Sequence, residues 1–450
     1  MSSSVRGYGV DNGKSGLTLW PERILGPRPG LKELNVICWS VFICFIVVPI
    51  CAVLFIQYKT GKLFFLHSPV DFIYVYGTGQ IANAHPPVDV YDYTLQKQTF
   101  NKIQPLHEGM YGPSPYPPLV SQFFRLFARL PFAEAYFLWM GVSIVLYVTG
   151  IALTLNSFLP DQKLENSLLF CFALAFSAFL MNTLADGQLS AVAVCFVGVA
   201  LALERRSKFF ISGLALSVLT YKFTFLFLLV PMLLLTRRFR SFAGFATGTG
   251  ILVAVTTAFT GPGVWPAYVR LVNGYGHTSG LYGKTSLRLW KYVDFNTFSY
   301  AILGRRTPIE FALLVCVVVS ALAWLGILLW QSKRDSRPEA NLAWAATLTW
   351  TMLLNVYYPI YDSILVVIAL ILALAALKEL KWPGATRKVV LLASLVFLVS
   401  WFTEPVAKRF GVQLLTLALL ALAIAESVYL DRAIRLRTAP KKEEALAAGF

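Results

Sequence analysis

Long apolar runs decide what this chain can fold into. Hydrophobic residues make up 57% of the 450 residues and charged residues only 14%, and the mean hydropathy is +0.64. A soluble protein of this length cannot cover so much apolar surface with so few charges. We therefore predict an all-α polytopic membrane protein, because a helix of about 20 apolar residues satisfies its own backbone hydrogen bonds in lipid.

Most of these runs have the length of one membrane span. One stretch, 207–236, is about twice as long, and Thr220-Tyr221-Lys222 interrupts it. We predict two short helices there that meet at the polar break, and about twelve transmembrane helices in total. The other spans are expected at 36–57, 134–157, 166–183, 187–204, 242–260, 308–330, 341–357, 360–378, 387–403 and 410–430.

Lys and Arg cluster in short loops between the apolar runs and produce the net charge of +16. This pattern indicates membrane topology and not nucleic-acid binding, because cytoplasmic loops carry an excess of Lys and Arg. Twelve spans with a cytoplasmic N-terminus place all these loops inside, together with the tails 1–35 and 431–450. Residues 36–430 are then one transmembrane domain. The basic loops are Glu204–Lys208, Arg237–Arg240, Ser332–Arg337 and Lys378–Lys388.

The same count places a second set of segments on the outer face. The loop 58–133 is too long to be a mere connector. Within it we predict a short helix over Asp71–Ala84 and a helix over Leu119–Leu130 that lies in the membrane interface. Loops 58–133 and 261–307 are expected to form the active-site side. Four shorter segments are expected on the same face: Asp186-Gly187-Gln188, Tyr221-Lys222, Tyr357–Asp362 and the turn at Glu404.

Polar residues at membrane depth are costly, so each is a functional candidate. Asp71 follows the first span directly and is suited to act as a general base. The alternative is that its carboxylate caps the helix that follows. Asp186-Gly187-Gln188 is either an ordinary tight turn or presents Gln188 to a sugar.

Lys and Arg usually gather in cytoplasmic loops, so cations on the expected outer face are unusual. Lys222, at the break in the long stretch, either extends its ammonium group to the interface or binds a phosphate. The loop 261–307 is either a solvated basic loop or a lid that supplies cations to a phosphate leaving group. Asp362 opens a late span and has a helix cap as its simplest role. The loop contains His277, Tyr282, Lys284, Ser286, Arg288 and Lys291.

Several enzyme classes lack their sequence signatures here. There is no P-loop, no G-x-G-x-x-G after a strand, no H-E-x-x-H and no G-x-S-x-G. The four histidines lack metal-ligand spacing, so no metal site is predicted. With no nucleotide-handling domain in the sequence, an activated substrate is expected to arrive on a lipid.

Six short motifs in one order resemble glycosyltransferase family 87, membrane enzymes of the GT-C class. The resemblance covers roughly residues 36–430. The motifs are Asp71-Phe72-Ile73-Tyr74, Pro87-x-x-x-Tyr91-Asp92, Tyr116-Pro117-Pro118, Gly187-Gln188, Lys222 in a broken span, and Tyr361-Asp362 opening a late span.

The resemblance implies a GT-C-like fold and an inverting transfer of a hexose, with mannose the best-known case, from a polyprenyl-phosphate donor. The acceptor would be a lipid or glycan on the outer face of a bacterial inner membrane. Asp71 would be the catalytic base, and no metal or cofactor beyond the lipid-linked donor is expected. The donor phosphate would be bound by Lys222, Lys284, Arg288 and His277. The substrate would be bound by Tyr74, Tyr91, Tyr116, Gln188, Tyr358, Tyr361 and Asp362.

A transporter or flippase for a lipid-linked sugar is the alternative function. Broken spans with polar residues are typical of transporters. A transporter needs those residues near the bilayer centre, within reach of both sides. The sequence instead predicts them on one face, next to long outer loops, which favours chemistry.

Overall fold

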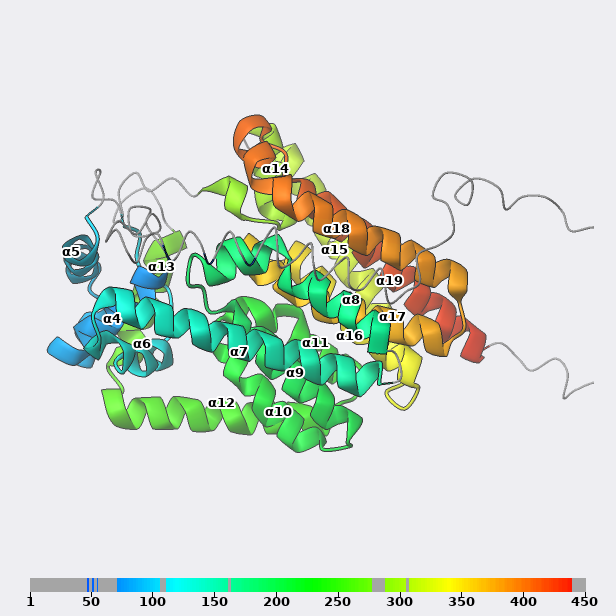
Figure 1. The fold of residues 1–450 in the computed structure, drawn as a ribbon, viewed down its shortest axis with the longest axis horizontal. Coiled ribbons are helices and arrows are strands. Elements are labelled where there is room, and N and C mark those ends of the chain that lie inside the picture. The colour runs from blue at the N-terminus through cyan, green and yellow to red at the C-terminus, as the bar shows by residue number, and fades with distance from the viewer. Residues whose placement is uncertain are drawn as a thin grey trace, which may run out of the picture.

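The computed structural model describes residues 71–105, 111–160, 163–276, 288–304 and 307–438, together with Val47, Cys51 and Phe55 (Figure 1). These residues form helices and no strand, with one isolated bridge between Tyr292 and Pro359. The predicted all-α class is confirmed. The first expected span, 36–57, lies almost wholly outside the described residues.

The segment before the first long helix is itself helical. It contains α4 (Phe72–Ala84), the 3-10 helix η2 (Pro87–Tyr91), α5 (Tyr93–Ile103), α6 (Pro118–Phe124) and the 3-10 helix η3 (Phe127–Arg129). The short helix predicted over Asp71–Ala84 is present as α4.

The helix predicted over Leu119–Leu130 is not continuous. It is divided into α6 and η3. The Asn83 side-chain amide donates to the Arg125 carbonyl at 2.9 Å. The backbone N–H of Arg129 donates to the Leu126 carbonyl and not to that of Arg125. A contact from α4 therefore takes the carbonyl that a continuous helix would use.

Six helical segments are long and apolar enough to cross a membrane. A bent pair, residues 167–174 of α8 (Lys163–Leu174) and the π-helix η4 (Ala178–Leu184), would make a seventh; its halves meet at 44°. The six are α7 (Phe132–Phe158), α12 (Phe239–Thr260), α15 (Pro308–Gln331), the 3-10 helix η8 (Ile360–Leu365) with α17 (Val366–Glu379), α18 (Pro383–Phe410) and α19 (Leu414–Thr438).

The count of about twelve spans is not confirmed among the described residues. The other expected segments are helical but short: α9 (Ser190–Arg205), α10 (Phe209–Ser217), α11 (Leu226–Leu235) and α16 (Arg337–Leu353). Even the longest of these, α16, has 17 residues, fewer than the roughly 20 that an untilted crossing needs.

The predicted break at Thr220-Tyr221-Lys222 is present. After α10, the 3-10 helices η5 (Val218–Tyr221) and η6 (Phe223–Phe225) lead into α11. Lys222 between them is extended, with φ −147° and ψ 98°. The chain therefore changes direction at this lysine, which leaves the helical ladder where the polar residues occur.

The core is built around α17, in which nearly every side chain is buried. Close helix contacts surround it. A Cβ atom on Gly198 of α9 would lie 2.4 Å from the carbonyl oxygen of Gly150 in α7. These two helices therefore pack at a distance that only small residues permit.

The loops collect at two opposite ends of the bundle. At one end α4, α5, α6 and α13 (Val264–Gly276) lie together (Figure 1). At the other end Arg238 forms an ion pair with Glu204, which also accepts from the Trp344 indole at 3.1 Å. The loops predicted to be basic and cytoplasmic are thus separated along the helices from the segments predicted to carry the site.

Candidate active site

Asp71 stands at the start of α4 but does not cap it. Its side chain makes no capping hydrogen bond to the helix. One carboxylate oxygen, Oδ2, instead accepts from Nε2 of Gln188 at 2.5 Å. The carboxylate is therefore directed across the fold and not into its own helix.

Gln188 is held by a rigid turn between η4 and α9. Gly187 has φ +71°, and a Cβ atom there would lie 2.7 Å from Cβ of Phe72. The Phe72 amide donates to the Asp186 carbonyl at 2.9 Å, and the Trp139 indole donates to the Gly187 carbonyl at 3.0 Å. Only glycine fits this turn against the start of α4, so the turn fixes Gln188 relative to Asp71.

Tyr116 completes this hydrogen-bond chain. Its hydroxyl donates to Oε1 of Gln188 at 3.1 Å. The Tyr116 carbonyl in turn accepts from the Tyr91 hydroxyl at 3.0 Å. Gln188 is almost fully buried, and with both ends of its amide engaged, its orientation is fixed.

Lys291 brings a cation to the same place. It ends the 3-10 helix η7 (Leu289–Lys291), and its Nζ lies 3.5 Å from Oδ2 of Asp186. Burial, then the nearby Asp71 carboxylate, raise the pKa of Asp186 to about 7; Lys291 opposes that shift and Glu404 adds to it. We call Asp71, Tyr116, Asp186, Gln188 and Lys291 the Asp71 cluster.

The carboxylates around Lys291 keep it charged. Burial alone lowers its pKa, but the carboxylates of Asp71, Asp186 and Glu404 outweigh burial and raise it. Arg288, the residue before η7, acts on Lys291 as a like charge from the same segment. The site therefore places an ammonium group beside three carboxylates.

Lys222 and Asp362 form a second group beside the cluster. They make an ion pair, and the Ser190 hydroxyl donates to Oδ1 of Asp362 at 2.6 Å. The Lys222 ammonium also lies 4.5 Å from the ring centroid of Tyr361. Lys222 is thus not an ammonium group extended to the interface, and Asp362, fully buried, does not cap η8, which begins after Pro359.

The Lys222–Asp362 pair adjoins the Asp71 cluster through the backbone. The Tyr221 hydroxyl donates to the Leu189 carbonyl at 3.0 Å, and Leu189 directly follows Gln188. Asp71 is also close enough to act electrostatically on Lys222 and on Tyr361. Segments that are far apart in the sequence therefore converge on one charged site.

The remaining expected residues lie in different surroundings. Tyr74 packs edge-on to Phe100, with ring centroids 5.5 Å apart, and Tyr91 packs against Tyr268 at 5.4 Å. The Tyr358 hydroxyl donates to the Asp362 carbonyl at 3.2 Å, inside the core. These three side chains pack against or hydrogen-bond to other residues of the fold. His277 and Lys284 lie outside the described residues.

Asp186, Ser190, Asp294 and Glu404 are not among the residues predicted for the site, although Asp186 and Glu404 stand in segments predicted on its side. Lys291 is one of the residues of the loop 261–307, predicted to be either a solvated basic loop or a lid that supplies cations. Asp294 caps α14 (Phe295–Leu303) and accepts from the Tyr358 amide at 2.8 Å. Two of these residues have a local sequence signal: Asp294 is an acid before a helix, and Asp186 stands in an Asp-Gly turn. No local pattern marks Ser190 or Glu404.

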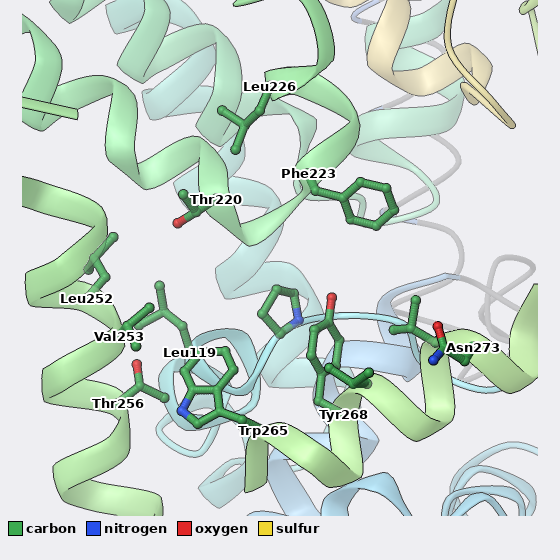
Figure 2. A pocket seen from close by; sticks show the side chains of 13 residues that line it. Leu119, Thr220, Phe223, Leu226, Leu252, Val253, Thr256, Trp265, Tyr268 and Asn273 are labelled. Atoms are coloured by element: carbon green, nitrogen blue, oxygen red, sulfur yellow. The ribbon is translucent and has the colours of Figure 1, made fainter. Parts of the chain in front are cut away.

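An apolar cavity of about 420 Å³ lies next to the site. Figure 2 shows Trp265 and Tyr268 of α13 facing Thr220 and Phe223 of the broken span. Pro117, beside Tyr116, also lines the cavity, so both Tyr116 and Lys222 have direct neighbours in its wall.

No group of three or more His, Cys, Asp and Glu side chains suited to a metal ion occurs within the described ranges. The carboxylates of Asp71 and Glu404 act electrostatically on Asp186, and all three act on Lys291.

The fold and the site define a helical membrane protein with a carboxylate and cations gathered at one end. The model of glycosyltransferase family 87 matches residues 115–356, more than half of the chain, and the chain belongs to this family. No curated protein and no solved structure matches it. Gln188 and Lys222 lie inside the matched segment, whereas Asp71 and Asp362 lie outside and are joined to it by those two side chains.

Proposed function

We propose that this membrane glycosyltransferase moves a hexose, mannose in the first instance, from a polyprenyl-phosphate donor to a lipid or glycan acceptor. The reaction inverts the anomeric carbon. The observation that carries the proposal is the Asp71 carboxylate, which is turned away from its own helix and held by Gln188 beside cations.

Asp71 is the general base in this proposal. It takes the proton of the acceptor hydroxyl, whose oxygen attacks the anomeric carbon while the bond from that carbon to the phosphate oxygen breaks. Gln188 positions the carboxylate, because its amide donates to Oδ2 and leaves Oδ1 for the acceptor. General-base catalysis of this kind contributes about 10²–10⁴-fold to a rate.

The leaving polyprenyl phosphate needs cations to stabilise its charge. Lys291 is the best supported of these, because its ammonium group is held near Asp71 and is about one-quarter exposed. Arg288 stands next to it in the same segment. Lys222 contributes less net charge, because Asp362 already pairs with it.

The lipid chain of the donor is proposed to enter the apolar cavity beside the site. Most of the cavity's lining residues are apolar, and Phe223 in its wall is 60% exposed. A polyprenyl chain lying there would leave its phosphate near Lys222 and Tyr116, whose neighbours line the wall.

The site is proposed to face the outside of a bacterial inner membrane, with both termini in the cytoplasm. The separation of basic loops from the Asp71 cluster along the bundle supports this orientation. Reporter fusions after Phe124 and after Arg206 are expected to report opposite sides of the membrane. If both report the same side, the orientation is wrong.

The function is tested with purified full-length protein and labelled donors. Polyprenyl-phosphate mannose and a nucleotide-linked mannose would each be supplied with a mixed lipid extract. We expect labelled product from the lipid-linked donor alone, and an α-linkage from a β-linked donor. Product from the nucleotide sugar alone would refute the donor class. Donor translocation in proteoliposomes without any product would support the transporter instead.

A further inference from the structure

A second groove lies at the end of the bundle opposite the Asp71 cluster. It has a volume of about 810 Å³ and lies between the end of α17 and the start of α18. The far end of α18 carries Glu404, which accepts from Asn182 at 2.7 Å and acts on the cluster. Since α18 has 28 residues, its start is roughly 40 Å from its end. The groove is therefore a separate site.

One side of the groove is apolar and open. Val390 is 47% exposed and Leu391 is 61% exposed, and both lie on α18. Leu377, at the end of α17, also lines the groove and is buried. This surface has the character of one that an acyl chain would cover in a bilayer.

The rim of the groove is basic. Lys378, Lys381 and Arg387 line it, and none of its nine described lining residues is acidic. The nearest acid in sequence, Glu379, acts on Arg205 of α9. In addition, α18 begins here at Pro383 with no side-chain cap and no acidic residue in its first turn, so its dipole adds to the positive potential.

We infer that this groove binds an anionic glycerophospholipid. The phosphodiester would lie between Lys381 and Arg387, and an acyl chain would cover Leu377, Val390 and Leu391. A basic rim above an apolar wall, at the end of the bundle where the basic loops gather, matches the charge and shape of such a lipid. The assignment is independent of the proposed transferase reaction.

The test is lipid binding by the purified full-length protein, measured by native mass spectrometry with phosphatidylglycerol and with zwitterionic phosphatidylcholine. Lys381→Gln/Arg387→Gln removes two charges from the rim. Arg206→Gln/Arg240→Gln removes two exposed charges from other basic turns and is the matched control. Thermal unfolding verifies that both variants fold.

We expect the rim variant to bind phosphatidylglycerol at least about fivefold more weakly, because each basic residue near a membrane surface contributes measurably to anionic-lipid binding. Wild type and control should bind it equally, and phosphatidylcholine should bind weakly to all three. Unchanged binding in the rim variant, an equal loss in the control, or no preference of the wild type for phosphatidylglycerol would each overturn the assignment.

Discussion

Asp71 and Gln188, 117 residues apart in the chain, are joined by a 2.5 Å hydrogen bond between the Gln188 amide and the Asp71 carboxylate. This bond connects the start of α4 to the segment that matches the glycosyltransferase family. It directs the Asp71 carboxylate toward Gln188 and not into its own helix, and it makes Gln188 a positioning residue in the proposed reaction.

The first prediction concerns Gln188→Leu. This change keeps the volume but removes the donor to Asp71, so the carboxylate is expected to lose its orientation. Misplacing a catalytic group by about 1 Å can reduce a rate about 10²-fold. We expect kcat to fall by about 10–100-fold, with less than a threefold change in KM.

Gln122→Leu on α6 is the control for this measurement, because Gln122 bonds to Arg125 and lies outside the Asp71 cluster. Equal activity of wild type and Gln188→Leu would show that the hydrogen bond does not position the base.

The second prediction concerns pH and Asp186. Burial and the Asp71 carboxylate raise its pKa from 3.8 to about 7. Between these two values the folded protein binds a proton that the unfolded chain does not, so stability falls as the pH rises from about 4 to about 7. We expect the Tm of the wild type to decrease over this range.

Asp186→Asn removes the titrating carboxyl group. The decrease in Tm with rising pH should therefore be a few degrees smaller than in the wild type. Asp89→Asn makes the same chemical change on η2, outside the Asp71 cluster, and is the control for the loss of a carboxylate. The measurement is thermal unfolding in detergent from pH 5 to pH 8. Parallel slopes for wild type and Asp186→Asn would contradict the proton assignment.

The third prediction concerns the Lys222–Asp362 pair. Removing one member of a buried ion pair leaves an uncompensated charge, which costs about 3–5 kcal/mol, whereas replacing both with apolar residues costs much less. Lys222→Met and Asp362→Leu are each expected to lower Tm strongly. The double variant should be more stable than either single variant.

A double-mutant cycle on thermal stability measures this coupling. Strictly additive losses would mean that the two side chains do not depend on each other. Thr220→Val, at the same break but outside the pair, is the control, and its effect should be small.

Local features of the sequence predicted much of the architecture. The break at Lys222 follows from three polar residues inside an apolar stretch, and α4 matches the short helix predicted over Asp71–Ala84. The span predicted at 341–357 has the length of α16 but lies four residues too late, because the polar residues Arg337 and Glu339 belong to the first turn of the helix. The span predicted at 187–204 begins three residues before α9, because Gly187 and Gln188 form a turn and not a helix. A contact from Asn83 divides the predicted helix at Arg125, and no local pattern announces it.

The location of the candidate residues was easier to predict than their contacts. Asp71, Tyr116, Gln188 and Lys222 share one end of the bundle, as their expected common face indicated. The ion-pair partners were not predictable, because the tertiary fold brings them together. Lys222 pairs with Asp362, and Lys291 pairs with Asp186, which is 105 residues away in the chain. Lys222 was expected to be a lone cation, and its buried partner changes what it can offer a phosphate.

Hexose transfer by Asp71→Asn tests directly whether Asp71 is the general base. Polyprenyl-phosphate mannose and the lipid extract would be supplied to equal amounts of wild type, Asp71→Asn and the control Asp89→Asn. We expect Asp71→Asn to retain its fold by thermal unfolding but to lose about 10²–10⁴-fold in rate, while Asp89→Asn matches the wild type. Transfer by Asp71→Asn at the wild-type rate would show that Asp71 is not the base.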